Sequence, residues 1–580
     1  MWIEGDWIKS KNQVTFTTRN SRKSRAKFHC SFCKVVLKYL KFYCQYSSLV
    51  GVKYLASSRT WSERIVWIVI HCVIISSLLF IVHSSYLAFV TSPILTSMDS
   101  DDYHTTKLDF PGIAICSINR ISRKSASAMA DKIFHANVTN LSADEILTLL
   151  AQLGNLYASE FQMDEDRNEE VHQLLTTYHK GDYDITDIMK TLSPQCSIML
   201  LKCKLHGRVR NCSSLFAFRK SQDGFCCIFN YAREDDDIPI MKDVLEPIKV
   251  HKVYDLGIDR GLSVLLEPFL DDYLYPMLPV TGWKILIFDP YDFPDVTSGG
   301  VMEILAIPRS ETYVDVVASS FFSTKAIEGY PIAKRKCIFS KEIRTLYGGT
   351  SYTYSDCIVD CKIHDIQKIC GCRPFMYPRR GKHEYTFRIC NNMDMECLAK
   401  YKTKWWIVFP HEDKNDEENI PNNTWGLHCN NCYPVCEDIS YDVLSAKSYM
   451  SQGRYKTDFL WNVTVKDQAI LHVFFSKYGS LRLKQDVAYY WYELMSDIGS
   501  ICGVFIGFSL ISVVELLYFF TLIFREMLCK RWVIEDESRK KEIQSQPIRT
   551  IYWNELLPRS WQAAPYYGHL QKTIKKRTRY

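Results

Sequence analysis

Two long apolar runs interrupt the otherwise mixed pattern of polar and apolar residues along this chain. The first contains no Asp, Glu, Lys or Arg from Ile65 to about Val90, and the second lies between Asp497 and Arg525 and is broken only by Glu515. Both exceed the ~20 residues that a helix needs to cross a bilayer. A soluble helix of this length would usually show a polar face. We therefore predict two transmembrane helices.

Charge indicates how these spans are oriented. Residues 1–64 hold 13 Lys and Arg against three acids, residues 525–580 hold 13 against six, and the middle is acidic. Basic ends are typical of the cytoplasmic side, so both termini are expected there. The basic, mostly polar start also argues against a cleaved signal peptide. The predicted parts are a cytoplasmic region 1–64, a span 65–90, an extracellular domain 91–492, a span 493–524 and a cytoplasmic tail 525–580.

The middle of the chain carries both helical and strand patterns, which predicts an α+β domain. Residues 120–250 are expected to be mostly helical, with Ser142 and Glu145 spaced as a capping box before an apolar run. β-Branched or aromatic runs near turn residues predict strands. They lie at 110–116, 261–266, 283–288, 313–317, 462–465 and 472–475.

Sixteen cysteines fall in the predicted extracellular domain, ten of them between Cys337 and Cys436. The even number and the clustering favour a disulfide framework in an oxidising compartment. Zinc is the alternative for the closest groups, but no His pattern accompanies them, so no metal site is expected. Five Asn-x-Ser/Thr glycosylation sequons lie in the same domain, at Asn137, Asn140, Asn211, Asn422 and Asn462.

Enzyme signatures are absent from the sequence: it has no Gly-x-Ser-x-Gly, no His-Glu-x-x-His and no Gly-rich phosphate loop. No catalytic residue and no enzymatic activity is therefore predicted. Basic runs such as Lys575-Lys-Arg577 beside a membrane helix mark the cytoplasmic side or touch anionic lipid more often than nucleic acid. The expected partner is the lipid bilayer, not nucleic acid.

The second apolar run contains the glycines and acidic residues that are the candidate functional residues of this chain. Glycines recur at every fourth position, at Gly499, Gly503 and Gly507. Such a stripe lets helices pack closely, and simple packing is the alternative explanation. Asp497 and Glu515 favour a pore, because carboxylates inside a membrane are costly and usually face an ion path. On a continuous helix the glycines align, with Ser509 and Glu515 further inward. Several copies around an axis are needed to enclose a pore.

The sequence resembles the degenerin/epithelial sodium channel family, most closely the insect pickpocket-type subunits. The resemblance covers about Cys44 to Phe524. The motifs that carry it are Trp61-Ser-Glu-Arg64, Phe110-Pro-Gly-Ile-Ala-Ile-Cys116, Gly224-Phe-Cys-Cys-Ile-Phe-Asn230, the ten-cysteine block, Leu494-Met-Ser-Asp-Ile-Gly499 and Gly507-Phe-Ser509.

The resemblance implies a multi-pass plasma-membrane channel that is trimeric, voltage-insensitive and blocked by amiloride. It would be a homotrimer or a heterotrimer with related subunits, and it would conduct Na⁺ without a cofactor. The family's Gly-x-Ser selectivity filter falls on Gly507, Phe508 and Ser509. Chemical and mechanical stimuli are both compatible with the large outside domain.

Four further pore positions follow from the same resemblance. The position where a bulky side chain holds the family's pore open falls on Ser496, and a residue linked to amiloride block falls on Gly503. The ring acid at the pore mouth would be Asp497, and the deeper acid Glu515.

The family's extracellular domain has a clenched-hand architecture, and its cysteine pairing carries over to this chain. The implied disulfides are Cys116–Cys226, Cys203–Cys212, Cys337–Cys436, Cys357–Cys432, Cys361–Cys429, Cys370–Cys397 and Cys372–Cys390, which leaves Cys196–Cys227 as the eighth.

The sequence departs from the family at a gating position. The family has His-Gly before the first span, in a segment that contributes to gating, and this chain has Val50-Gly51. An isopropyl group cannot make the hydrogen bonds of an imidazole. The alternative is therefore a non-conducting or partner-dependent subunit, or a surface receptor with the same fold. An ATP-gated trimeric channel is a third hypothesis, disfavoured by the Asp-Ile-Gly, Gly-x-Ser and ten-cysteine patterns.

Overall fold

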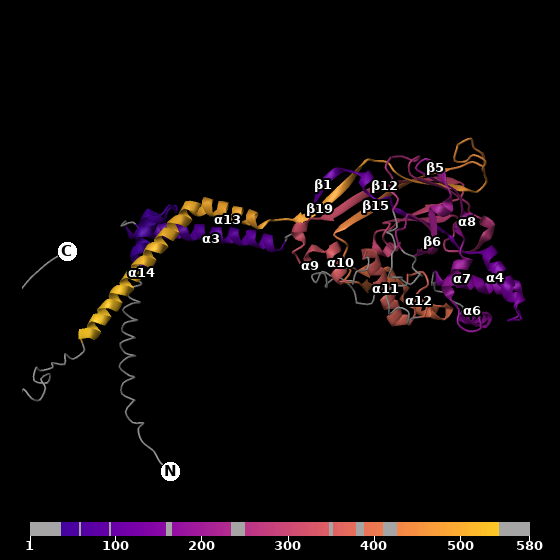
Figure 1. Ribbon diagram of the computed structural model, residues 1–580, viewed down its shortest axis with the longest axis horizontal. Helices are drawn as coiled ribbons and strands as arrows, with labels where there is room; N and C mark the ends of the chain where they lie inside the picture. The colour runs from indigo at the N-terminus through magenta and orange to yellow at the C-terminus, as the bar shows by residue number, and fades with distance from the viewer. Residues whose placement is uncertain are drawn as a thin grey trace, which may run out of the picture. The chain divides into compact units, whose positions relative to one another are not determined.

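The structure is a computed structural model of the 580-residue chain (Figure 1). It describes residues 36–56, 60–91, 94–157, 165–233, 250–346, 352–378, 388–409 and 426–544. The chain divides into two compact units. The first combines Met1–Thr91 with Tyr489–Tyr580, and the second is Ser92–Ala488.

Two β-sheets organise the second unit. The larger has the strand order β1-β19-β12-β18-β8-β4-β5, with β15 also paired to β12, and the smaller has the order β11-β10-β2-β7-β6. The larger sheet comprises β1 (Ile94–His104), β4 (Leu200–Leu205), β5 (Arg208–Arg210), β8 (Leu262–Leu266), β12 (Ser310–Ser323), β15 (Glu437–Tyr449), β18 (Ala469–Phe475) and β19 (Gly479–Val487). The smaller comprises β2 (Gly112–Ser117), β6 (Phe216–Ser221), β7 (Gly224–Phe229), β10 (Trp283–Phe288) and β11 (Met302–Ala306).

Strand β12 pairs with three other strands of the large sheet. Its first half runs parallel to β18, its second half runs parallel to β19, and β15 pairs antiparallel along almost its whole length. Two-stranded pairs complete the β-structure. They are β3 (Asn119–Ser122) with β9 (Tyr273–Pro276), β13 (Val408–Phe409) with β14 (Leu427–His428), and β16 (Gly453–Arg454) with β17 (Thr464–Val465).

The central strands β2 and β7 of the small sheet are buried on both faces, which explains why nearly all of their residues are apolar. Ile113 and Ile285 point into a core shared with Val314 of the large sheet. Ala114 and Leu286, the next residues along, point into a second cluster on the opposite face. Successive strand residues face opposite sides, so only a sheet covered twice needs apolar residues at every position.

The helices of this unit gather along one side of the sheets (Figure 1). Ser142 and Glu145 form the predicted capping box at the start of α5, each side chain accepting from the other's backbone N–H. The helices are α4 (Arg123–His135), α5 (Ala143–Ala151), α6 (Glu165–Tyr178), α7 (Ile185–Leu192), α8 (Cys196–Met199), α9 (Ile332–Arg335), α10 (Ser340–Leu346), α11 (Tyr354–Cys370) and α12 (Met395–Trp406).

The prediction that residues 120–250 are mostly helical is correct as far as α8 and wrong beyond it. Residues 200–229 form β4 to β7 instead. Cys196–Cys227 and Cys203–Cys212 tie this stretch together, and β7 is buried at every position. Burial and cross-links outweigh local helical preference here. Residues 234–249 lie outside the described part of the chain.

Eight disulfides cross-link the second unit: seven have the pairing that the family resemblance implies, and the eighth, Cys196–Cys227, joins the two cysteines that this pairing left over. Cys357 and Cys361 lie four residues apart on α11, so both point from one helix face toward Cys432 and Cys429. The other pairs are Cys116–Cys226, Cys196–Cys227, Cys203–Cys212, Cys337–Cys436, Cys370–Cys397 and Cys372–Cys390. Each closed loop restricts the unfolded chain and typically adds about 2–4 kcal/mol of stability.

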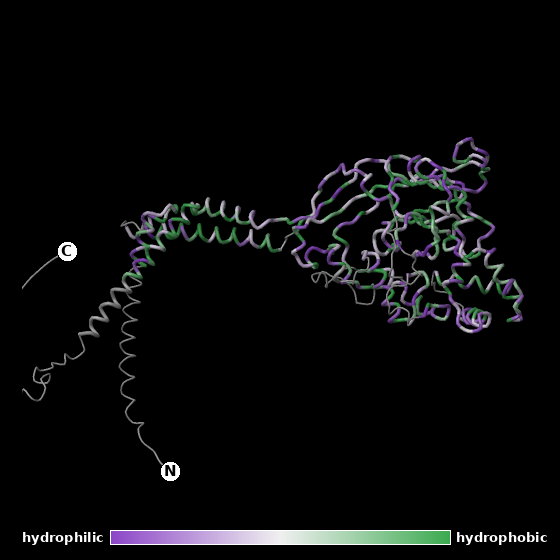
Figure 2. The backbone as a smooth tube through the Cα atoms, viewed as in Figure 1, coloured by the Kyte–Doolittle hydropathy of each residue, from purple (hydrophilic) through white to green (hydrophobic). Residues whose placement is uncertain are grey.

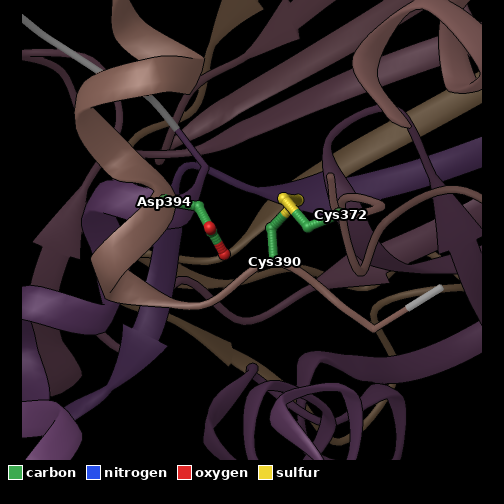
Figure 3. A group of neighbouring side chains, drawn as sticks. All are labelled: Cys372, Cys390 and Asp394. Carbon is green, nitrogen blue, oxygen red and sulfur yellow. A yellow bond between two sulfur atoms is a disulfide. The ribbon is translucent and has the colours of Figure 1, made fainter. Parts of the chain in front are cut away.

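One cluster has the residue types of a metal site. Cys372, Cys390 and Asp394 bring ligand atoms within 4.8 Å of one another. Figure 3 shows the two sulfur atoms bonded to each other. Zinc binds thiolates, so this oxidised pair offers none, and Asp394 is bound by Arg388.

A buried ion pair joins α11 to the turn after β10. Lys362 Nζ lies 2.8 Å from Asp295 Oδ2, and the two side chains are 3% and 0% exposed. Asp295 also accepts from the Thr297 backbone N–H at 2.8 Å. Burying two charges costs free energy unless both stay paired, so the pair constrains how α11 docks.

Replacing Lys362 with Met should destabilise the second unit by about 3–5 kcal/mol, because Asp295 would be left as an unpaired buried carboxylate. Lys341→Met is the matched control, since its ion pair with Glu328 is solvent-exposed and worth at most about 1 kcal/mol. Denaturant unfolding of the disulfide-bonded chain, followed by Trp fluorescence, measures both. Equal stability of the two variants would contradict the role of the pair.

A second polar cluster crosses the centre of the large sheet. His472 on β18 bonds to Ser263 on β8 through Nδ1 at 2.8 Å and to Glu311 on β12 through Nε2 at 2.9 Å. Tyr313 stacks on the ring, and the nearby Lys204 and Asp259 pair with each other at 2.7 Å. Burial lowers the pKa of His472, and Glu311 opposes this only in part.

The lowered pKa of His472 predicts an acid-sensitive sheet. The native state holds the imidazole neutral more strongly than the unfolded chain does, so stability is lost as pH falls below the unfolded pKa of about 6.5. His472→Gln should flatten the fall in melting temperature between about pH 7 and pH 5. His135→Gln, at an exposed position, should not. The same fall in wild type and His472→Gln would refute this origin.

The first unit contains the apolar helices. They are α3 (Trp61–Thr91), α13 (Trp491–Ile506) and α14 (Leu510–Gln544), preceded by a helix over residues 36–46 and by α2 (Val52–Ala56). In the described part of the chain, α3 is the one helix long and apolar enough to cross a membrane alone, and Figure 2 shows it hydrophobic along most of its length. Helix α13 and residues 510–529 are long and apolar enough to cross a membrane only when taken as a pair. The two helices are bent by 78° relative to each other.

Candidate functional site

The predicted filter residues form the break between α13 and α14. Helix α13 ends because Gly507 adopts a φ of +71°, in the left-handed region. The Gly507 N–H donates to the Gly503 carbonyl at 3.0 Å, and the Phe508 N–H donates to the Cys502 carbonyl at 3.3 Å. The bond from the Gly507 N–H to the Gly503 carbonyl is that of an αL cap, and glycine occupies its left-handed position without strain.

Ser509 starts the next helix immediately. The Ser512 N–H donates to Ser509 Oγ at 3.4 Å, and the Ser509 N–H donates to Ser512 Oγ at 3.2 Å. These reciprocal bonds satisfy backbone donors at the start of α14 as a capping box does, with serine in place of the usual Glu. The triplet is thus a helix stop, a single connecting residue and a helix start.

The expectation of one continuous helix through the second apolar run is therefore wrong. Gly499 and Gly503 lie on α13, but Gly507 ends that helix, and Glu515 lies on α14 beyond the bend. The three glycines cannot form one stripe with Ser509 and Glu515 below it. The physical reason is the cap itself, because no i to i+4 ladder continues through Gly507.

The carbonyl end of α13 meets this break. A helix C-terminus carries a partial negative charge, which attracts cations. A Cβ added to Gly503 would lie 3.8 Å from the Phe508 carbonyl oxygen, so Gly503 sits beside the backbone of the triplet. The Phe508 side chain is 39% exposed in the single chain. Ser496 and Asp497 are exposed on α13, at the end away from the break.

The segment before α3 packs directly against the break. The Val50 N–H donates to the Ile506 carbonyl at 3.1 Å. Val50 Cγ2 lies 2.7 Å from where a Gly507 Cβ would be, so only glycine fits there. Gly51 turns the chain at a φ of +82°, and a Cβ on it would meet His71 of α3 at 2.9 Å. The gating pair predicted from the sequence thus touches the predicted filter.

Glu515 and two serines that the sequence did not single out complete the site. The Ser48 backbone N–H donates to Glu515 Oε2 at 3.0 Å, and Ser48 Oγ lies 2.8 Å from Ser512 Oγ. The deeper acid therefore holds the N-terminal segment. Ser512 could have been found as the third residue after a helix-capping Ser509, but nothing in the sequence links Ser48 to it.

Aromatic and charged contacts extend the same packing toward the end of α14. Tyr43 meets Phe519 edge-on with ring centroids 5.0 Å apart, and Lys38 Nζ lies 3.9 Å from Glu526. Tyr54 stacks on Trp67 of α3 at 4.4 Å. Residues 36–56 therefore contact both α3 and α14.

The predicted glycosylation sequons fall in the second unit. Asn137, Asn140, Asn211 and Asn462 are exposed, so each could accept a glycan without unfolding. Asn422 lies outside the described residues.

Comparison with known proteins identifies the family. The family model "Amiloride-sensitive sodium channel" matches residues 43–519. The sodium channel protein Nach of Drosophila melanogaster is 26% identical over 519 residues, which is 87% of this chain and 90% of Nach. Pickpocket protein 28 of the same fly is 23% identical, over 88% of this chain and 82% of that protein. The mouse bile acid-sensitive ion channel is 22% identical, over 82% and 86%.

The chain joins a disulfide-rich domain to apolar helices, and the Gly-x-Ser triplet separates two of these helices, α13 and α14. This is the architecture of a membrane channel. The chain belongs to the amiloride-sensitive sodium channel family, also called the degenerin/epithelial sodium channel family. Its members are plasma-membrane ion channels, not enzymes, and typically form multimeric assemblies.

Gly507→Ala should disrupt the break for two separable reasons. The left-handed φ costs an alanine about 1–2 kcal/mol, and the added methyl overlaps Val50 at a further cost of about 1–3 kcal/mol. Val50→Ala removes the overlap but not the φ strain. Hydrogen exchange in the peptide that contains Gly507 to Ser512 should therefore rise steeply in Gly507→Ala and fall back partly in the double variant. Wild-type exchange in Gly507→Ala alone would contradict the cap.

Proposed function

We propose that this chain is a pore-forming subunit of a voltage-insensitive sodium channel in the plasma membrane. The observation that carries the proposal is the break at Gly507–Ser509, where a helix C-terminus, non-helical backbone and serine hydroxyls meet inside an apolar run. Irregular backbone at membrane depth is tolerated where it lines a cavity. Carbonyl oxygens there can replace part of an ion's hydration shell.

The assembly proposed is a trimer of this chain or of this chain with related subunits. A single broken helix encloses nothing, so equivalent triplets must surround an axis. In this arrangement α3 and the α13–α14 pair are the two spans, both termini are cytoplasmic and the second unit is extracellular. Asp497 forms an acidic ring at the outer mouth, where it concentrates cations.

Ser496 and Gly503 complete the proposed pore. A bulky side chain at Ser496, which is exposed on α13, would crowd the outer pore and hold it open. Amiloride block is proposed at Gly503, beside the Phe508 carbonyl. Opening would follow a chemical or mechanical stimulus acting on the extracellular domain.

A partner-dependent or non-conducting subunit is the second candidate, motivated by Val50. The contact to Ile506 uses the Val50 backbone N–H, which every residue except proline supplies, so this bond survives the loss of the family's histidine. The isopropyl group nevertheless lies against Gly507. The two candidates differ in whether the chain conducts without related subunits.

Voltage clamp of cells expressing this chain with Ser496→Val, with surface delivery confirmed, separates the candidates. A pore-forming subunit gives an inward current that disappears when external Na⁺ is replaced by a large organic cation and that amiloride blocks. Asp497→Asn should then lower single-channel conductance about twofold or more, because the mouth loses negative charge. Absence of current from surface protein would favour the partner-dependent role.

A further inference from the structure

Ser512 is a fully buried polar side chain in the second apolar run, with 0% exposure. Its hydroxyl oxygen lies 2.8 Å from Ser48 Oγ, 3.2 Å from the Ser509 backbone nitrogen and 3.3 Å from Ser509 Oγ. Three polar groups therefore converge on one buried oxygen. Two belong to the predicted filter residue, and the third belongs to the segment before the first span.

The hydrogen-bonding capacity of the hydroxyl matches these neighbours. A hydroxyl offers one donor and two acceptor sites. Ser512 Oγ accepts from the Ser509 N–H, and its proton or those of Ser48 and Ser509 fill the remaining contacts. Removing one hydroxyl would leave the others underpaired in a buried setting, where an unmade hydrogen bond is costly.

Helix capping alone does not explain the arrangement. The Ser509 and Ser512 bonds suffice to start α14, and Ser48 is 464 residues away from Ser512 in sequence. A second bond, from the Ser48 N–H to Glu515 one turn along α14, aligns Ser48 on the same helix face. Ser48 is thus held at two points while contacting the oxygen that holds Ser509.

We propose that Ser48 and Ser512 are positioning residues for the filter: the hydroxyl chain Ser48–Ser512–Ser509 couples the cytoplasmic N-terminal segment to the backbone at Ser509. Displacement of the segment breaks the hydrogen bonds between these hydroxyls and increases the mobility of the backbone at Ser509. The inference deepens the proposed function and rests on it for its effect on ion permeation. Its structural part concerns hydrogen bonding only and stands independently of conduction.

The structural test is hydrogen exchange on the full chain in lipid nanodiscs. Ser48→Val and Ser48→Thr have the same shape but differ in the hydroxyl, and both keep the backbone bond to Glu515. Ser48→Val should raise exchange in peptides containing Val50 and Ser509 by about tenfold, the effect of one lost hydrogen bond. Ser48→Thr should not. Ser512→Ala should raise hydrogen exchange in the same two peptides.

Thr521→Val is the matched control on α14, because the Thr521 hydroxyl donates to the Tyr518 carbonyl of its own helix and to no other element among the described residues. It should leave exchange at Val50 and Ser509 at the wild-type rate. Exchange in Ser48→Val and Ser512→Ala that equals the Thr521→Val rate would overturn the proposal, whether or not the protein conducts.

Permeation gives the functional readout. In channels carrying Ser496→Val, Ser48→Val should raise the K⁺ to Na⁺ permeability ratio measured from bi-ionic reversal potentials, and Ser48→Thr should restore it. A merely structural role would change current amplitude without moving the reversal potential. An unchanged ratio in both Ser48→Val and Ser512→Ala would overturn the positioning role. Absence of current in every variant, wild type included, would count against the proposed function, while hydrogen exchange would still decide the hydroxyl chain.

Discussion

The left-handed backbone at Gly507 is the constraint on which the rest of the first unit depends. It ends α13, frees the carbonyl end of that helix and allows Ser509 to start α14 after one intervening residue. A side chain at Gly507 would be strained by its φ and would overlap Val50. The Gly-x-Ser triplet therefore has a structural role that is independent of ion binding: its glycine ends one helix, its middle residue connects, and its serine starts the next helix.

The break between α13 and α14 interrupts the helical hydrogen bonds, so freed groups that face the protein and not an aqueous cavity need partners there. The N-terminal segment supplies several. The Val50 N–H bonds to the Ile506 carbonyl, and Ser48 bonds to Glu515 and Ser512. Glu515, a carboxylate that would be costly unpaired, is used to hold this segment. The disulfide-stapled second unit supports itself separately, with its own cores and ion pairs.

Much of this could be predicted from the sequence, but the break could not. Apolar length identified both runs, and β-branched or aromatic runs near turn residues located strands such as β10 and β18, because those signals are local. Disulfide partners came from family resemblance, since spacing does not determine connectivity. The 200–229 strands were missed because cross-links and burial override local preference there. Ser48 and Ser512 were missed because their contact joins opposite ends of the chain, which no local pattern encodes.

The central claim is that the N-terminal segment, residues 36–56, lies against the break in the second apolar run. Cysteines at Ser48 and Ser512 test it directly, because the two hydroxyl oxygens are 2.8 Å apart and a disulfide needs only a small further approach. Mild oxidation of Ser48→Cys/Ser512→Cys in native membranes, followed by proteolysis and mass spectrometry, should yield a linked peptide that neither single variant gives. A properly delivered double variant that forms no such link would contradict the account.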